Sequence, residues 1–280
     1  LSVSRQIRSA AAGWGRLHRA AMLSIVQQLS ARTLSLSVAT LVLTLLLAWY
    51  RWCRQRANNK RLRGPQPGEK VVYFVRHGQA WHNQTLDWSL PDPELTPKGE
   101  EQAFSLRGDP CLAPALSAAE GRRPQLLVAS PLRRTMQTAF LGFGDLKPEI
   151  QWLLEPDLQE RNDVACDTGA PDLGAAYLKQ IGRADLEEQY GKLPQGWYKK
   201  EGPYAPDIRL VRARFRRFTD RLRDRPESIF IVVAHDIVLS TGLDLEKKFA
   251  NCEVRPYALT PSGNWRELPA NGSWLRDPLD

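Results

Sequence analysis

Three short apolar runs, each ending abruptly at polar or charged residues, constrain the fold of this chain most strongly. They are Val71 to Val75, Leu126 to Ala129 and Ile229 to Ala234, and each has the length of a β-strand. Because they are apolar throughout, they are typical of central strands in a sheet covered on both faces. The residues that follow them are Arg76-His77-Gly78, Ser130-Pro131 and His235-Asp236.

Helical patterns fall between these runs. Thr96 precedes Pro97 and an acidic first turn, which predicts a capped helix through about Leu106. Ser130-Pro131 repeats this pattern and predicts a helix that runs to about Phe140. A third helix is predicted by an apolar stripe at i, i+4, i+7 and i+11, namely Val211, Phe215, Phe218 and Leu222. The alternation predicts an α/β fold, a three-layer α/β/α sandwich with a mostly parallel central sheet.

The charge of the chain is unevenly distributed. The formal net charge is +8, but residues 1–68 contain eleven Lys and Arg and no acid. The remaining residues hold 28 of the 39 basic residues and all 31 acidic ones, so this body is mildly acidic and nucleic-acid binding is not expected. The Arg-rich segment from Arg209 to Arg225 leaves RNA or an anionic membrane as an alternative, but its apolar stripe indicates that the arginines occupy a solvated face.

The basic N-terminal part contains a candidate membrane segment. Residues 33–50 are eighteen uncharged residues with aromatics at the downstream end, which predicts a transmembrane or signal-anchor helix. It separates a basic arm, residues 1–32, from a basic Pro/Gly linker, residues 51–68, and the catalytic domain is expected over 69–280. Because bases concentrate downstream, the body is expected to face the cytosol. A buried helix, a cleaved signal sequence or an organellar targeting sequence stays open as an alternative.

The sequence gives little support for a metal or another cofactor. Cys53, Cys111, Cys166 and Cys252 are widely separated and form no C-x-x-C pair. A metal site made of Cys166 with three histidines, His77, His82 and His235, fits by residue type alone. Arginines beside it would repel a cation, so no metal and no cofactor are expected.

The basic residues after the strands point to an anion site. Parallel strands bring their carboxyl ends to one edge of a sheet, so Arg76 and His77, the Ser130 to Arg134 segment, and His235 should meet there. Guanidinium groups match the oxygens of a phosphoryl group. We therefore predict a phosphate site.

Five motifs now suggest a family. In chain order they are R-H-G-Q-A-W-H-N, L-T-P-K-G-E-E-Q-A, S-P-L-R-R-T-M-Q-T-A, L-Q-E-R and A-H-D. Together they resemble the histidine phosphatase superfamily, in its phosphoglycerate mutase-like branch. The resemblance spans Val71 to about Leu259 and leaves out the N-terminal arm.

The resemblance implies a role for each matching residue. His77 resembles the nucleophile that takes the phosphoryl group, and Glu160 resembles the acid that protonates the leaving oxygen. The groups that hold the phosphoryl oxygens are implied to be Arg76, Arg133 and His235, with Asn83 lining the pocket. A surface salt bridge between Glu160 and Arg161 is the alternative for that acid.

Departures from the family pattern bear on the activity. His82 stands where many relatives have Trp, and it could contact substrate or only pack. Asp236 stands where Gly is usual, and it could support a charged His235 or repel phosphate. The mutase-type continuation after L-Q-E-R is missing, which favours a phosphomonoester hydrolase over a mutase-type phosphotransferase. A weakened module that only binds phospholigands is a further alternative.

No sequence pattern identifies the substrate or the oligomeric state. A small phosphorylated molecule or a phosphoprotein is expected. The segment from about Ala165 to Asp207 reads as an insertion over the site. Its aromatics, Trp197, Tyr198 and Tyr204, are candidates for lid residues or for packing.

Overall fold

A computed structural model of the chain describes residues 44–50, 64–119, 122–146 and 150–270. The chain divides between Lys60 and Arg61 into two units, and the second unit carries the sheet. The basic arm, residues 33–43 of the predicted membrane segment and residues 51–63 of the linker lie outside the described residues. Residues 44–50 are helical. Within the described ranges, no helix combines the length and the apolar character that a membrane crossing requires.

Six strands form one mixed sheet in the body. In chain order they are β1 (Lys70–Arg76), β2 (Leu126–Ala129), β3 (Gln151–Leu154), β4 (Ile229–Ala234), β5 (Val254–Leu259) and β6 (Trp265–Glu267). Their spatial order is β3-β2-β4-β1-β5-β6. The first four are parallel, and β5 is antiparallel to both of its neighbours, β1 and β6. Val233 of β4 pairs with both Val75 and Ala129. The residues that follow these three strands therefore start at the same level of one sheet edge.

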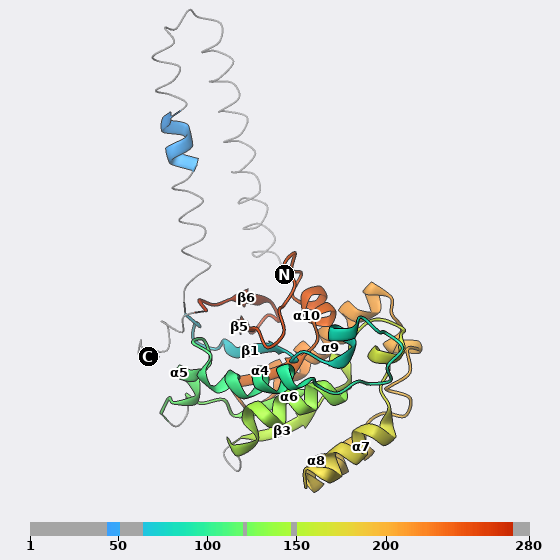
Figure 1. Ribbon diagram of the computed structural model, residues 1–280. Helices are drawn as coiled ribbons and strands as arrows, with labels where there is room; N and C mark the ends of the chain where they lie inside the picture. Colours follow the sequence, from blue (N-terminus) through green and yellow to red (C-terminus); the bar gives the residue numbers. More distant parts are fainter. Residues whose placement is uncertain (1–43, 51–63, 120–121, 147–149, 271–280) are drawn as a thin grey trace, which may run out of the picture. The chain divides into compact units, whose positions relative to one another are not determined.

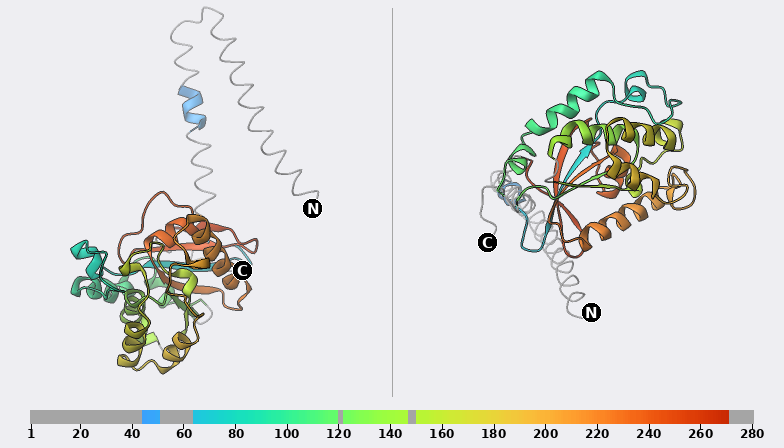
Figure 2. Two further views of the ribbon diagram at one scale, coloured as in Figure 1. Left: turned by 90° about the vertical axis from the view of Figure 1, so that its right-hand side faces the viewer. Right: turned by 90° about the horizontal axis from the view of Figure 1, so that it is seen from below.

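Helices cover both faces of the sheet (Figure 1 and Figure 2). Tyr73 and Val75 pack into the core under α5 (Ala113–Leu116) and α6 (Arg133–Phe143), whereas Val72 and Phe74 pack into the core under α9 (Ile208–Asp224) and α10 (Asp236–Gly242). The α/β prediction is confirmed. The helices are α3 (Trp81–Thr85), α4 (Pro97–Ser105), α5 (Ala113–Leu116), α6 (Arg133–Phe143), α7 (Pro171–Gln180), α8 (Ala184–Gly191), α9 (Ile208–Asp224) and α10 (Asp236–Gly242).

Of the two helix caps predicted from the sequence, Thr96 is confirmed and Ser130 is wrong. Thr96 caps α4 as expected, because its Oγ1 accepts a hydrogen bond from the Gly99 N–H at 3.1 Å. Ser130 does not cap α6, which begins only at Arg133 and has no side-chain cap. The α6 helix also continues to Phe143, beyond the predicted end.

The loop after β1 and the first turn of α4 approach each other closely. A Cβ atom on Gly99 would lie 2.0 Å from the Gln79 carbonyl oxygen, and one on Gly78 would lie 2.5 Å from the Gly99 oxygen. Both positions therefore require glycine. The Gly78 N–H also donates to Thr138 Oγ1 of α6 at 3.0 Å, which fixes the backbone beside His77.

The arginines of α9 are mostly engaged within the body. Arg217 and Arg221 pair with Asp157, and Arg221 also pairs with Glu155. Further ion pairs are Arg209–Asp207, Arg212–Asp244, Arg223–Asp220 and Arg225–Glu227. The predicted apolar stripe of this helix is fully buried. Because acids within the body neutralise most of these charges, the helix does not favour the RNA-binding alternative.

The insertion contains two helices, α7 and α8. Trp197 follows them and is buried, with its ring 5.7 Å from the Tyr190 ring and 6.0 Å from the Tyr198 ring. A Cβ atom on Gly169 would lie 2.7 Å from the Trp197 ring. Trp197 therefore packs inside the insertion, in agreement with the packing alternative.

Candidate active site

His77 follows β1 and is almost fully buried. Its Nδ1 lies 2.7 Å from the Gly78 carbonyl oxygen, and its Nε2 lies 3.3 Å from Arg134 Nε. A carbonyl only accepts and a guanidinium only donates, so Nδ1 carries the proton and Nε2 presents a lone pair. Burial, followed by the charges of Arg134 and Arg76, holds the pKa of His77 well below its usual value. The imidazole is therefore neutral, and its Nε2 lone pair is the form that nucleophilic attack requires.

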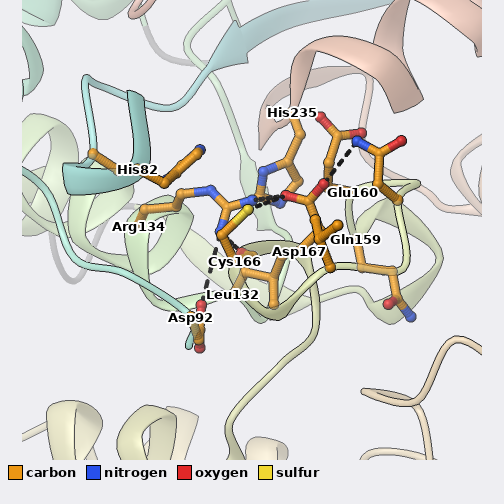
Figure 3. A network of polar contacts seen from close by, with 12 residues as sticks. His82, Asp92, Leu132, Arg134, Gln159, Glu160, Cys166, Asp167 and His235 are labelled. Atoms are coloured by element: carbon orange, nitrogen blue, oxygen red, sulfur yellow. Dashed lines mark hydrogen bonds and ion pairs between the residues drawn. The ribbon is translucent and has the colours of Figure 1, made fainter. Parts of the chain in front are cut away.

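Arg134, in the first turn of α6, holds the centre of the site (Figure 3). Besides His77, its guanidinium donates to the Cys166 carbonyl at 2.6 Å and to Asp167 Oδ1 at 2.9 Å. The guanidinium is buried, and Asp92 Oδ1 lies 3.9 Å from its Nη1. Arg134 therefore holds a fixed positive charge against the His77 imidazole.

Arg133, the arginine that the family resemblance implied for the phosphoryl oxygens, points elsewhere. Its Nε donates to the Asp92 carbonyl at 3.0 Å, and its Nη1 lies 3.6 Å from Glu94 Oε2. Successive residues on a helix project about 100° apart, so only one of two adjacent arginines can face the site. The structure gives the position beside His77 to Arg134, and this corrects the expectation for Arg133.

His235 follows β4 and lies beside His77, with 5.1 Å between the ring centres. Its Nε2 is 2.9 Å from Ser130 Oγ, which follows β2. Ser130 thus joins two strand ends. Burial is the largest cause that lowers the pKa of His235 well below its usual value, with Arg134 second.

Arg76 is the last residue of β1, and Asp236 the first of α10. Arg76 Nη1 donates to the Phe249 carbonyl at 2.6 Å, and Asp236 Oδ1 accepts from the Phe249 N–H at 2.7 Å. Burial lowers the pKa of Arg76, and the charges of Asp236 and Glu160 oppose that effect. Asp236 therefore supports Arg76 and anchors the loop before β5, a role different from the two that the sequence suggested.

Glu160 is buried and binds the start of α10. Its Oε2 accepts from the Ile237 N–H and its Oε1 from the Val238 N–H, both at 3.2 Å. Oε1 also accepts from the backbone N–H of Arg161 at 2.8 Å, and the predicted alternative of a salt bridge with the Arg161 side chain does not form. Burial, and next the charge of Asp167, raises the pKa of Glu160. A raised pKa suits a carboxyl group that gives up a proton.

His82 and Asn83 lie on α3 beside this group. Asn83 Oδ1 accepts from the Ala80 N–H, so its Nδ2 must donate to His82 Nε2 at 2.9 Å. Burial lowers the pKa of His82 to about 3, so the ring is neutral and carries its proton on Nδ1. The ring centre lies 6.1 Å from that of His77.

Several buried nitrogen atoms around His77 have no hydrogen-bond partner among the described residues. They are Arg76 Nε, His82 Nδ1 and His235 Nδ1. Buried polar groups are normally paired, so such atoms close to His77 indicate a site that binds oxygen atoms of an anion. In the described part of the chain, no group of three or more His, Cys, Asp or Glu side chains is placed to hold a metal ion.

Five of the six predicted site residues thus lie together in the structure, and Arg133 points away from them. The five are Arg76, His77, Asn83, Glu160 and His235. Asp167 was not predicted at the site. Arg134 and Ser130 belong to a segment predicted to reach it, but neither was given a role there, and Ser130 was predicted to cap a helix. Arg134 lay within the quoted motif, and the helical phase of the buried residues on α6 was the signal that distinguishes it from Arg133.

Comparisons with known proteins place this site in context. The chain matches the histidine phosphatase superfamily (branch 1) over residues 72–259. It is 30% identical over 199 residues to a protein of Schizosaccharomyces pombe described as a probable phosphatase, covering 67% of this chain and 84% of that protein. It is 34% identical over 200 residues to phosphomutase-like protein 3 of Candida albicans, covering 63% of this chain and 60% of that protein.

Solved structures also show similarity to the chain. A phosphoglycerate mutase from Bacillus anthracis aligns with a TM-score of 0.46 and 15% identity, covering 74% of this chain and 95% of that one. A mycobacterial glucosyl-3-phosphoglycerate phosphatase aligns with a TM-score of 0.44 and 19% identity, covering 71% and 97%.

Proposed function

We propose that this chain, which belongs to branch 1 of the histidine phosphatase superfamily, hydrolyses phosphomonoesters through a phosphohistidine on His77. Its family and its relatives make it an enzyme of the phosphatase type. One observation carries the proposal. The His77 imidazole is held with its Nδ1–H on the Gly78 carbonyl and its Nε2 lone pair against Arg134. This is the tautomer that an attacking imidazole needs.

In the first step, His77 Nε2 attacks the phosphorus atom. The bond from phosphorus to the ester oxygen breaks, and the leaving oxygen takes the proton of the Glu160 carboxyl group. Arg76, Arg134 and His235 hold the phosphoryl oxygens as charge moves toward the leaving group. The alcohol then departs, and the phosphoryl group stays on Nε2.

In the second step, water attacks the phosphohistidine. The Glu160 carboxylate takes a proton from the water, the bond between phosphorus and Nε2 breaks, and inorganic phosphate leaves. His77 regains its neutral tautomer and Glu160 its proton. In both steps Asn83 positions His82, whose Nδ1–H lies in the same buried cluster.

Kinetics of the His77→Ala variant test this proposal. The full chain should hydrolyse 4-nitrophenyl phosphate, EDTA should leave the rate unchanged, and His77→Ala should abolish turnover because no other group carries the phosphoryl intermediate. Full activity in that variant would refute the proposal. Isomerisation of phosphoglycerate in the presence of a bisphosphate primer, without phosphate release, would instead identify a mutase.

A further inference from the structure

Two buried cations lie on the backbone that carries Glu160. Lys200 of the insertion donates to the Gln159 side-chain oxygen at 2.7 Å and to the Glu160 carbonyl at 2.6 Å. Arg214 of α9 donates to the carbonyls of Asp157 and Gln159, both at 2.5 Å, and to that of Glu160 at 3.3 Å. The Glu160 carbonyl therefore accepts from both cations.

These cations are unusual in their surroundings. Lys200 is 8% exposed and Arg214 is fully buried. Among the described residues, no carboxylate lies within ion-pair distance of either charge, and both groups donate to neutral oxygens. The charge of Glu160 acts on both groups from farther away. An unpaired buried cation costs free energy, so a buried lysine of this kind is rarely a packing choice alone. Consistent with that cost, burial lowers the pKa of Lys200 to about 7.

Gln159 joins the insertion to the same backbone. Its Nε2 donates to the Trp197 carbonyl at 2.5 Å, while its Oε1 accepts from Lys200. Trp197 itself is packed in the core of the insertion. Gln159, the residue before Glu160, is therefore hydrogen-bonded to two residues of the insertion, Trp197 and Lys200.

The side chain of Glu160 is held separately, by the Ile237 and Val238 N–H groups of α10. Its backbone and its carboxyl group are thus fixed by different elements. A shift of the backbone by a fraction of an ångström would move the carboxyl group relative to the leaving oxygen, and proton transfer is sensitive to such shifts.

We propose that Lys200 and Arg214 are positioning residues for Glu160, and that Lys200 makes proton donation depend on the packing of the insertion. This inference rests on the proposed function, in which Glu160 protonates the leaving oxygen.

The test is a comparison of Lys200→Met with Lys199→Met. Met has a similar length and no charge, and Lys199 is the exposed neighbour of Lys200. Rates would be measured on a series of substituted phenyl phosphates from 4-nitrophenyl to 4-methoxyphenyl, with the full chain and with thermal melting as the folding control. Arg214 is too deeply buried for a first test.

Lys200→Met should lower kcat/KM for the 4-methoxyphenyl ester by about 10-fold and leave kcat/KM for the 4-nitrophenyl ester within about threefold, because kcat/KM reports the first step, in which only the poorer leaving group needs the proton. Glu160→Gln should show the same pattern with a larger loss, and Lys199→Met should show none. An equal loss on all esters, or no loss on any, would overturn the inference. Activity retained in His77→Ala would instead defeat the proposed function itself.

Discussion

At the scale of single residues, adjacent arginines on α6 have different surroundings. Arg134 contacts His77 and Asp167, whereas Arg133 contacts Asp92 and Glu94 on a partly exposed surface. Arg134→Lys keeps the charge but loses the fixed guanidinium geometry, so kcat/KM for 4-nitrophenyl phosphate should fall by about 100-fold. Arg133→Lys is the matched control and should stay within about threefold. A larger loss in the control would reverse the assignment.

The pH dependence also belongs to single residues. Below its own pKa, His77 is protonated and its Nε2 has no lone pair, so activity is lost as pH falls through that value. Because burial holds this pKa well below 6.5, the acid limb of kcat/KM should have its midpoint below 6.5. The profile must be corrected for the second ionisation of the substrate, near pH 6. A midpoint at or above 6.5 would contradict the buried, neutral nucleophile.

Residue types were easier to predict than side-chain directions. The sequence motif contained Arg133 and Arg134 side by side, and only the start of α6 decides which one faces His77. Lys200 could not be identified in the sequence, because its partners are a carbonyl and an amide oxygen rather than an acid that a pattern would pair with it.

At the scale of elements, the loop after β1 and the first turn of α4 approach each other closely beside the site. Gly99→Ala would place its Cβ against the Gln79 carbonyl, so the free energy of unfolding should fall by about 2–4 kcal/mol in urea denaturation. Gly108→Ala is the control, because an added Cβ there meets nothing within 4 Å. It should change stability by less than about 1 kcal/mol. Equal effects would show that the close approach does not constrain the fold.

Strand β5 and helix α7 were not predicted, because each contains residues that are atypical of its type of element. Strand β5 contains Arg255 and Pro256, which disfavour a strand, yet Arg255 is held by the Lys247 and Lys248 carbonyls. In α7, Gly174 weakens the helical sequence pattern. A glycine is needed there to make room for Tyr190, whose hydroxyl would lie 2.2 Å from an added Cβ. By contrast, the three apolar runs are uniform and give the central strands directly.

At the scale of the whole molecule, the site is assembled by the order of the strands. The ends of β1, β2 and β4 come from residues far apart in the chain, and their shared register places His77, Ser130 and His235 together. That convergence could be predicted because parallel strands end at one edge. The arrangement of the insertion around Glu160 could not, since it depends on contacts between segments without periodicity.

The direct test of the account is to trap the phosphoenzyme. The full chain would be mixed with a radiolabelled aryl phosphate, quenched within one turnover, and digested into peptides, with His77→Ala as the blank. The account predicts a label on the peptide that contains His77, stable in alkali and lost in mild acid, as expected for a phosphorus–nitrogen bond. Turnover without label, or an acid-stable label on another peptide, would contradict it.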